Sequence, residues 1–362
     1  MAKICFLIYD FTKMGGAERA SAKLMNELVK SHTVSMISIF NKYDDFGYAL
    51  DSRINTSRII NSEASISKTI ATTTNFVRKH IKKEKCEYLL SIDVATAPIG
   101  VLGTFMTKAK LIMCDRSSVY NEDMYSKINL RLYGWLGIHA CDIYQVMTEA
   151  GKKGCLERYH VSSNKVKVIP NWIDEMAIKD CSYSHENRKI ITVGRATPEK
   201  NYEGLIDIAE IIKPYAKGWE WHIWGNFENE YGQKLLDEIK RRKLDNFLIH
   251  RGITKNIYDE YGKYCMYVMT SKFEGMPNVI LEARGSKLPV IAYNCKTGPS
   301  ELIVDGENGF LIPMNNTEMM AEKIKLLIDN KKIAQRMSEK WNLEIERYYK
   351  SNVIKKWERL FE

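Results

Sequence analysis

Short apolar runs alternate with amphipathic segments along most of the chain, and this alternation is the strongest constraint on its fold. Apolar runs of four to eight residues are typical of strands buried in a parallel sheet, whereas the segments between them have the periodicity of helices. In the first half we predict helices at 17–31 and about 67–84, and strands at 3–9, 33–40, 87–92, 110–113, 143–147 and 165–169. Such an alternation predicts an α/β fold with a doubly wound parallel sheet.

The same pattern restarts after a polar, irregular stretch at 170–187. Predicted strands follow at 189–193, 219–224, 247–250, 266–269 and 289–293, with helices at 202–212, 231–242, 257–264 and 277–286. The last segment, 331–362, is predicted to be helical, with an apolar stripe formed by Met337, Trp341, Ile345 and Tyr348. A chain of 362 residues has the length of two domains, so we predict two doubly wound sheets.

Basic residues are in excess and are unevenly distributed. The chain has 54 Lys and Arg against 45 Asp and Glu, a formal net charge of +9, of which residues 1–170 carry +8, 171–330 carry −3 and 331–362 carry +4. A basic surface favours nucleic acid, an anionic membrane or a phosphorylated substrate, although a merely Lys-rich protein is the alternative. Because no basic stretch interleaved with aromatic residues occurs, we expect no nucleic-acid partner.

Cysteine usage and hydropathy indicate the compartment. The eight cysteines form no C-x-x-C pair and no zinc-knuckle spacing, and several lie in apolar runs, as expected of reduced core thiols. The apolar run near the N terminus is too short for a signal peptide, and the stretch 94–106 is too short to span a membrane. We therefore expect a cytoplasmic protein that could be peripheral on the inner face of the cell membrane.

Ligands of open α/β sheets bind beyond the carboxyl ends of the strands, so the loops after the strands are the candidate sites. The first loop holds Gly15 and Gly16 before a predicted helix, whose N-terminal N–H groups suit a phosphate, although an ordinary tight turn is the alternative. It does not match G-x-G-x-x-G, which disfavours a nicotinamide or flavin dinucleotide. A second loop carries Arg195 and Lys200, which can bind phosphate oxygens; the alternative is two solvated surface residues.

The third loop carries two carboxylates. Glu274 precedes Gly275 and Pro277, and Glu282 lies on the helix that Pro277 is predicted to begin. Carboxylates accept hydrogen bonds from sugar hydroxyls, and a ribose diol is a suitable partner. A capping role for Glu274 and a surface position for Glu282 are the alternative.

These loops resemble those of the retaining glycosyltransferase family 4. Glu274 and Glu282, with seven residues between them, are similar to its two-glutamate signature, and further similar segments lie at 15–19, 168–174, 194–201, 223–225, 297–301 and 308–311. The resemblance covers nearly the whole chain. It implies two Rossmann-like domains of the GT-B type facing across a cleft: an acceptor domain at 1–170, a nucleotide-sugar domain at 171–340, and a C-terminal helix at 341–362 that crosses back to the N-terminal domain.

The resemblance also implies the reaction. A hexose or N-acetylhexosamine would pass with retention from a nucleotide sugar, expected to be UDP-linked, to a sugar acceptor, expected to be lipid-linked, in surface polysaccharide or glycan biosynthesis. Catalysis would need no metal and no cofactor: Arg195 and Lys200 would neutralise the diphosphate, and Glu274 would contact the donor sugar. Glu282 would hold the ribose, and the other implied donor-site positions are Gly16, Gly194, Gly225, Gly275, Met276, Asn278 and Val279.

Two positions depart from the family pattern. Arg116 stands at or near a position where many relatives have a histidine, and we assign it, with Gly15, to the acceptor side; Trp172 replaces a usual glycine in the linker. Two other functions stay open: a nucleotide-sugar epimerase or hydrolase on the same fold, and a non-catalytic two-lobed ligand-binding protein.

Two segments of the first half bear on a membrane partner. Arg78, Lys79, His80, Lys82 and Lys83 form a basic cluster, and the segment 124–138 mixes basic, aromatic and aliphatic residues. This composition suits an anionic leaflet or an acceptor diphosphate. A solvated helix face and a core helix are the alternative.

Overall fold

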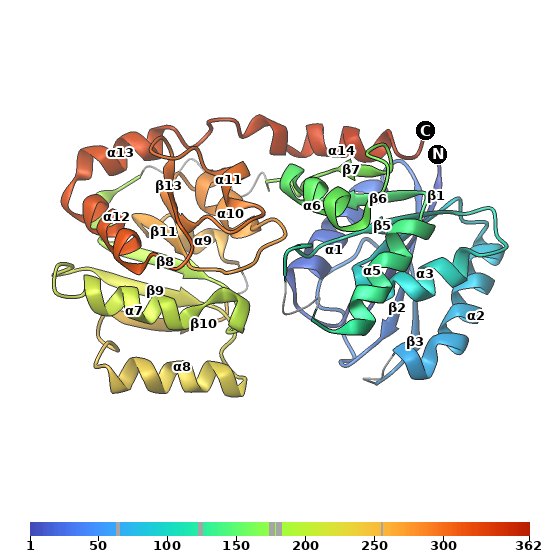
Figure 1. The fold of residues 1–362 in the computed structure, drawn as a ribbon, viewed down its shortest axis with the longest axis horizontal. Helices are drawn as coiled ribbons and strands as arrows, with labels where there is room; N and C mark the ends of the chain where they lie inside the picture. Colours follow the sequence, from blue (N-terminus) through green and yellow to red (C-terminus); the bar gives the residue numbers. More distant parts are fainter. Residues whose placement is uncertain (63–65, 122–125, 174–177, 179–182, 255) are drawn as a thin grey trace. The chain divides into compact units, whose positions relative to one another are not determined.

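The computed structural model describes residues 1–62, 66–121, 126–173, 178, 183–254 and 256–362, which form two compact units (Figure 1). Unit 1 comprises Met1–Asn171 and Ile354–Glu362, and unit 2 comprises Trp172–Val353. Each unit contains one parallel sheet covered by helices, which confirms the predicted α/β fold. Three parts of the features discussed above lie outside the described residues: positions 124–125 of the segment 124–138, Asp174 at the end of the segment 168–174, and Cys181, one of the eight cysteines.

The sheet of unit 1 has the strand order β3-β2-β1-β4-β5-β6-β7, and all neighbouring strands are parallel. Its central strands β1, β2 and β4 are almost wholly buried, as their continuous apolar runs predict. The strands are β1 (Lys3–Ile8), β2 (Thr33–Phe40), β3 (Asn55–Ile60), β4 (Tyr88–Ile92), β5 (Lys110–Cys114), β6 (Ile143–Val146) and β7 (Val166–Val168).

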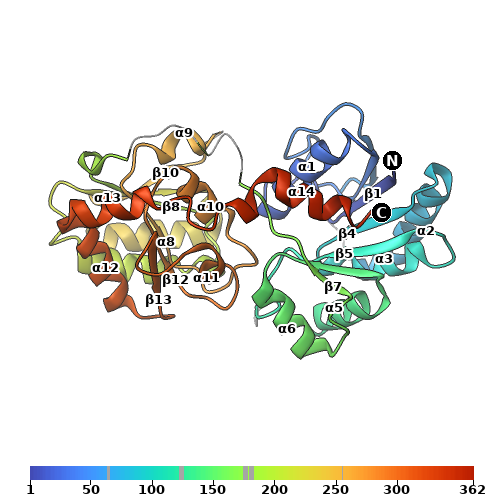
Figure 2. The ribbon, with the colours of Figure 1, turned by 90° about the horizontal axis from the view of Figure 1, so that it is seen from above.

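Helices cover both faces of this sheet. Helices α2, α3 and α5 pack on one face around a core that includes Leu7, Val77, Leu89 and Met113, while α1 and α14 lie on the other face (Figure 2). The helices are α1 (Gly16–Leu28), α2 (Ile66–Glu84), α3 (Ala97–Thr104), α5 (Ile128–Ala140), α6 (Glu149–Tyr159) and α14 (Lys350–Glu358), with a short 3-10 helix η1 (Val94–Thr96).

The sheet of unit 2 has the order β10-β9-β8-β11-β12-β13 and is also parallel throughout. Its core is built largely by α7, α8, α12 and α13 against the sheet. The strands are β8 (Lys189–Val193), β9 (Glu220–Trp224), β10 (Leu248–Gly252), β11 (Met266–Met269), β12 (Val290–Tyr293) and β13 (Gly309–Ile312). The helices are α7 (Tyr202–Ile212), α8 (Glu230–Arg241), α9 (Tyr258–Tyr261), α10 (Asn278–Gly285), α11 (Pro299–Leu302), α12 (Thr317–Asp329) and α13 (Lys331–Glu339), with 3-10 helices η3 (His185–Asn187), η4 (Pro198–Lys200) and η5 (Glu346–Tyr348).

Each sheet has one point where the strand order reverses direction. In unit 1 it lies between β1 and β4, and in unit 2 between β8 and β11. The connections from these strands leave in opposite directions, which opens a crevice at the carboxyl ends where ligands of such sheets bind. The fold therefore places the loops after β1 and β4 at one candidate site and those after β8 and β11 at another.

Two strands were missing from the sequence-based prediction. Strand β3 lies at the sheet edge and is only half-buried, and its sequence Asn-Thr-Ser-Arg-Ile-Ile lacks the long apolar run of a central strand. Strand β13 is four residues long and also lies at an edge. Edge strands bury less apolar surface, so their periodicity is weaker.

The prediction of one continuous helix over 331–362 is wrong. Helix α13 ends at Glu339, and α14 begins only at Lys350. Between them the carbonyl groups of Trp341 and Leu343 accept hydrogen bonds from the buried guanidinium of Arg284, at 2.8 and 2.5 Å. These carbonyls bind a side chain instead of the N–H groups of a helix turn, so the helix is interrupted.

The same contacts keep this segment with unit 2. Residues up to Val353 belong to unit 2, and only Ile354–Glu362 belong to unit 1, whereas the sequence placed the return at 341. Within unit 1, His32 Nε2 lies 2.6 Å from Glu358 Oε2, and the Phe361 ring packs against Tyr88. The end of α14 and the residues after it therefore complete unit 1.

Candidate active site

An ion pair between a lysine and a glutamate lies at the reversal point of unit 2. Lys200, at the end of η4, places Nζ 2.6 Å from Oε1 of Glu274, which lies on the loop after β11. Both side chains are largely but not fully buried, with 24% and 11% of their surface exposed. The two loops are also joined by hydrogen bonds, because the Thr270 hydroxyl donates to the Lys200 carbonyl and the Lys272 N–H donates to the Glu199 carbonyl. The sequence predicted both residues for this site but not that they pair.

Two glycines bring the loops after β8 and β9 into close contact. A Cβ atom at Gly225 would lie 1.8 Å from the carbonyl oxygen of Gly194, so only glycine fits there. The Gly194 N–H donates to the Trp224 carbonyl at 2.9 Å, and the Tyr202 hydroxyl donates to the Gly194 carbonyl at 2.8 Å. Arg195, the next residue, is exposed. The backbone is thus fixed at Gly194, while the guanidinium beside it is accessible to a ligand.

Glu282 is buried, which rules out the surface position considered above. It lies on α10 with 3% of its surface exposed, and its carboxylate accepts hydrogen bonds from Tyr261 at 3.2 Å and Tyr258 at 3.4 Å. The sequence analysis did not single out these two tyrosines. Their spacing of three residues puts them on one face of α9, and this was the signal available.

The loop before α10 is fixed by contacts with the loop after β12. Gly298 has φ +98°, and a Cβ there would lie 2.4 Å from Cδ of Pro277. The Thr297 hydroxyl donates to the carbonyl of Glu274. Among the predicted donor-site residues of this loop, Met276 is buried, whereas Gly275, Asn278 and Val279 are partly exposed. Pro277 occupies the N-cap position and has no polar side-chain atom, so it cannot cap the helix through its side chain.

At the reversal point of unit 1, the two predicted glycines have different surroundings. A Cβ at Gly15 would lie 2.2 Å from a carboxylate oxygen of Glu18, whereas a Cβ at Gly16 would meet nothing within 4 Å. Gly15 is buried at the N-cap of α1, and Tyr48 donates to its carbonyl at 3.1 Å. Gly16 is exposed, so a ligand can approach its backbone closely.

Arg116 lies in the loop after β5 and is only partly exposed. Its guanidinium donates to Oδ1 of Asn171 at 3.2 Å and lies 6.0 Å from the ring of Trp357 on α14. Burial lowers its pKa. The neighbouring Asp115 accepts hydrogen bonds from the N–H and hydroxyl of Ser117, and burial raises the pKa of its carboxyl group.

Asp93, which the sequence analysis did not single out, stands at the same edge directly after β4. Its φ of +72° is unusual for a residue other than glycine. Burial, followed by the charges of Asp115 and Glu18, raises the pKa of its carboxyl to about 7, against a smaller opposing effect of Arg116. A carboxyl group that titrates near neutrality at the end of a strand is a candidate for proton transfer or acceptor binding.

We expect Asp93→Asn to stabilise unit 1 in a pH-dependent way. The pKa of Asp93 rises from 3.8 to about 7 on folding. The protonated carboxyl therefore keeps its full stabilising effect, relative to the ionised form, below pH 3.8, and this effect is lost as the pH rises through 7. Asparagine carries no such penalty, and the variant should be more stable than the wild type by on the order of 1–2 kcal/mol at pH 8 and by less at pH 5. Urea unfolding at both pH values measures this, with exposed Asp45→Asn as the control; equal effects at the two pH values would contradict it.

A pair of parallel sheets, each with ligand-binding loops at its reversal point, is the architecture of two-domain glycosyltransferases of the GT-B type. HepE from Anabaena, solved in complex with UDP and glucose, shares this fold with a TM-score of 0.79 at 18% identity, over 100% of this chain and 98% of that one. Residues 178–342, which lie within unit 2, match the family described as glycosyl transferases group 1.

Curated relatives match the chain over its full length. An uncharacterized glycosyltransferase of Haemophilus influenzae is 28% identical over 359 residues, and the amylovoran biosynthesis glycosyltransferase AmsD of Erwinia amylovora is 25% identical over 367; each alignment covers 99% of both chains. An N-acetyl-D-galactosaminyltransferase of Campylobacter jejuni, whose name specifies a PP-undecaprenol acceptor, is 24% identical over 99% of this chain and 98% of its own. Among the described helices, none combines the length and apolar character needed to cross a membrane.

Proposed function

We propose that this enzyme transfers a hexose or N-acetylhexosamine from a UDP-sugar to a lipid-linked sugar acceptor in bacterial surface polysaccharide biosynthesis, with retention and without a metal. The single observation that carries the proposal is the Lys200–Glu274 pair at the reversal point of unit 2, beside exposed Arg195. A diphosphate needs fixed positive charge as it leaves, and a sugar needs a carboxylate to accept from its hydroxyls. The pair supplies both within one contact.

The roles of the residues follow from this geometry. Lys200 and Arg195 compensate the charge that develops on the departing nucleoside diphosphate, which is the task a metal ion performs in other transferases. Glu274, partly exposed and held by Lys200, accepts hydrogen bonds from the donor sugar. The partly exposed loop residues Gly275, Asn278 and Val279 lie beside it, where backbone N–H groups can bind the sugar or phosphate.

The choice of a UDP-sugar and a lipid-linked acceptor rests on relatives. HepE was solved with UDP and glucose, the Campylobacter relative is named for a PP-undecaprenol acceptor, and AmsD is named for amylovoran biosynthesis. Unit 1 carries Gly16 and Asp93 at its reversal point and Arg116 after the adjacent strand β5, and these residues are assigned to the acceptor or to the donor phosphates. Release of UDP from a panel of UDP-sugars, with and without a lipid-diphosphate-linked acceptor, tests the proposal.

The outcomes of that assay separate the proposed function from its alternatives. Acceptor-dependent UDP release supports transfer, and the anomeric configuration of the isolated product, read by NMR, tests retention. Free sugar released equally without acceptor would favour the epimerase or hydrolase. Tight nucleotide binding without turnover across the whole panel would favour the binding protein. Full activity in excess EDTA is expected, whereas its loss and recovery with Mg²⁺ would contradict metal-independent catalysis.

We expect Glu282→Gln to weaken UDP binding about 10- to 100-fold. A hydrogen bond to a charged group contributes about 1.5–3 kcal/mol, and the variant keeps the shape of the side chain while removing its charge. Isothermal titration with UDP measures the effect, and Glu230→Gln on the surface of unit 2 is the matched control. Unchanged affinity in Glu282→Gln would remove this residue from the nucleotide site.

We expect unit 1 to bind anionic membranes through α5. Ile128, Leu132 and Trp135, spaced along one side of this helix, are 77%, 59% and 52% exposed, and Arg131 lies among them. An apolar stripe with basic neighbours suits the interface of a bilayer. The basic cluster of α2 offers fewer charges to a membrane than its sequence suggested. His80 is buried, and Arg78 donates to the Leu102 carbonyl at 2.6 Å.

Sedimentation with vesicles containing phosphatidylglycerol measures this binding. The wild type should bind at low salt and dissociate at high salt, because screening weakens the electrostatic attraction. Leu132→Ser combined with Trp135→Ser should abolish binding, whereas Tyr43→Ser, at a residue of similar exposure elsewhere in unit 1, should not. No binding of the wild type at low salt would exclude the membrane partner.

A further inference from the structure

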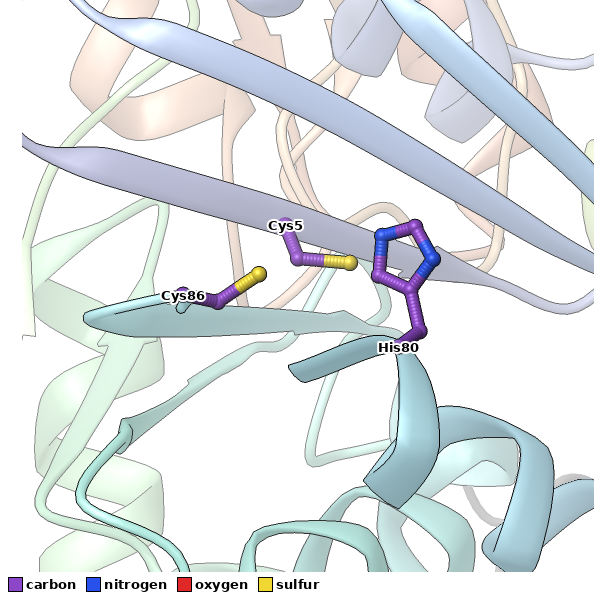
Figure 3. Close-up of side chains that lie close together, drawn as sticks. All are labelled: Cys5, His80 and Cys86. Atoms are coloured by element: carbon purple, nitrogen blue, oxygen red, sulfur yellow. The ribbon is translucent and has the colours of Figure 1, made fainter. Parts of the chain in front are cut away.

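Two cysteines and a histidine converge inside unit 1, away from the candidate active site. Cys5 of β1, His80 of α2 and Cys86 are all buried, and their potential ligand atoms lie within 4.8 Å of one another (Figure 3). Among the described residues, no other group of three such side chains comes together in this way. The three residues are called the Cys5–His80–Cys86 cluster below.

Local structure explains why these side chains meet. Helix α2 ends with Lys85 in the left-handed conformation, at φ +54°, and the Cys86 N–H donates back to the Ile81 carbonyl at 3.0 Å. This arrangement is a Schellman-type helix end, which turns the chain sharply. Cys86 therefore faces the sheet beside β1, and His80, six residues earlier in the last part of α2, faces the same point from the helix (Figure 3).

A fourth polar group completes the surroundings. Ser35 of β2 is the register partner of Cys5, and its hydroxyl lies 3.1 Å from Nε2 of His80. The two thiols also interact with each other: a hydrogen bond with Cys86, together with burial, raises the pKa of Cys5, and the hydrogen bond with Cys5 lowers the pKa of Cys86. The imidazole of His80 can offer a nitrogen lone pair to a metal.

We propose that the Cys5–His80–Cys86 cluster binds one zinc ion. Soft thiolate sulfurs with an imidazole nitrogen are a preferred ligand set for Zn²⁺, and the Ser35 hydroxyl or a water bound beside it fills the fourth position. Binding forms two Zn–S bonds and one Zn–N bond and releases the two thiol protons to solvent. The two thiolate charges then neutralise the ion, so no net charge is buried.

The distances are compatible with such a site. Zinc binds sulfur at about 2.3 Å and nitrogen at about 2.0–2.1 Å, so the ligands of a tetrahedral site lie roughly 3.5–3.8 Å apart. The cluster atoms lie within 4.8 Å of one another. Small side-chain rotations that move each ligand atom by about 0.5 Å would close most of that difference. Because Cys5 is the third residue of β1 and Cys86 precedes β4, the ion would bind away from the carboxyl ends of these strands. Its role is therefore structural: it joins the end of α2 to the sheet.

Metal analysis of the full-length protein tests the proposal. The protein is incubated with Zn²⁺ and reductant, freed of loose ions by gel filtration and analysed by mass spectrometry for metals. We expect about one zinc per wild-type chain, and at least a tenfold lower content in both Cys5→Ala and Cys86→Ala. Cys155→Ala removes an equally buried thiol of unit 1 that lies outside the cluster, and should keep the wild-type zinc content.

A second measurement needs no variant and covers the case in which a cysteine variant fails to fold. A strong chelator should lower the midpoint of thermal unfolding of the wild type, and added Zn²⁺ should restore it. Substitution with Co²⁺ should give the visible absorption of a tetrahedral thiolate site. The proposal is overturned if the wild type retains no zinc and its midpoint does not respond to Zn²⁺, or if Cys155→Ala loses as much zinc as Cys5→Ala.

Discussion

Lys200→Ala should lower kcat/KM for glycosyl transfer by about 10²- to 10³-fold, the loss typical of removing one preorganised group that stabilises developing negative charge. The effect should fall mainly on kcat, because the charge on the departing diphosphate grows in the transition state. The variant also leaves Glu274, only 11% exposed, without its cation in that contact. Steady-state UDP release with saturating donor and acceptor measures the change.

The controls for this prediction come from the same unit. Lys234 forms an ion pair of 2.7 Å with Glu230 on the surface of α8, and Lys234→Ala should leave the rate unchanged. Glu274→Gln should also lose at least about 10²-fold, because its amide cannot balance Lys200 or accept from sugar hydroxyls as strongly. If Lys200→Ala and Glu274→Gln both retain full activity, this pair is not the catalytic centre.

Arg284→Met should destabilise unit 2 by about 3 kcal/mol and lower its thermal midpoint by roughly 6–12 °C. The guanidinium is 1% exposed and donates to the carbonyl groups of Leu302, Trp341 and Leu343 at 2.6, 2.8 and 2.5 Å. Burial lowers its pKa to about 10, so it is still charged at neutral pH. Methionine fills much of the volume but leaves all three carbonyls without this donor, and the penalty for such groups exceeds the gain from burying methionine.

Differential scanning calorimetry of the full chain measures this change. Arg284→Lys should be intermediate, because a single ammonium cannot match the planar fork of arginine at three acceptors. Arg241→Met is the matched control, since Arg241 is exposed and contacts only the neighbouring Glu238 in the described ion pairs. A midpoint within 2 °C of the wild type for Arg284→Met would mean that these hydrogen bonds do not hold the 341–343 segment.

Features encoded by local pattern could be predicted from the sequence. Continuous apolar runs marked the buried strands, and the glycines and charged residues after them marked the loops at both reversal points. Gly194 and Gly225, for example, directly follow the predicted strands 189–193 and 219–224, although their close approach to each other was seen only in the structure. In a doubly wound parallel sheet the loops after the strands lie at one edge, which placed the loops after β8 and β11 at the same edge but did not make them neighbours.

Features that depend on contacts distant in sequence could not be predicted. The tyrosines that bind Glu282 are more than 20 residues from it, and the Lys200–Glu274 contact spans 74. His80 looked like part of a basic cluster because its neighbours on α2 are cations, yet the helix turns it inward to Cys5. The raised pKa of Asp93 likewise arises from burial and from carboxylates on other loops.

The path of the chain between the two units has a consequence for biosynthesis. Unit 2 is one uninterrupted stretch, Trp172–Val353, whereas unit 1 needs both ends of the polypeptide. On the ribosome, all of unit 2 therefore emerges before the residues that supply Glu358 and Phe361 to the surface of unit 1. Unit 1 therefore stays incomplete until unit 2 has been synthesised. A chain that terminates early lacks the contacts of Glu358 and Phe361, which belong to the unit that is synthesised first.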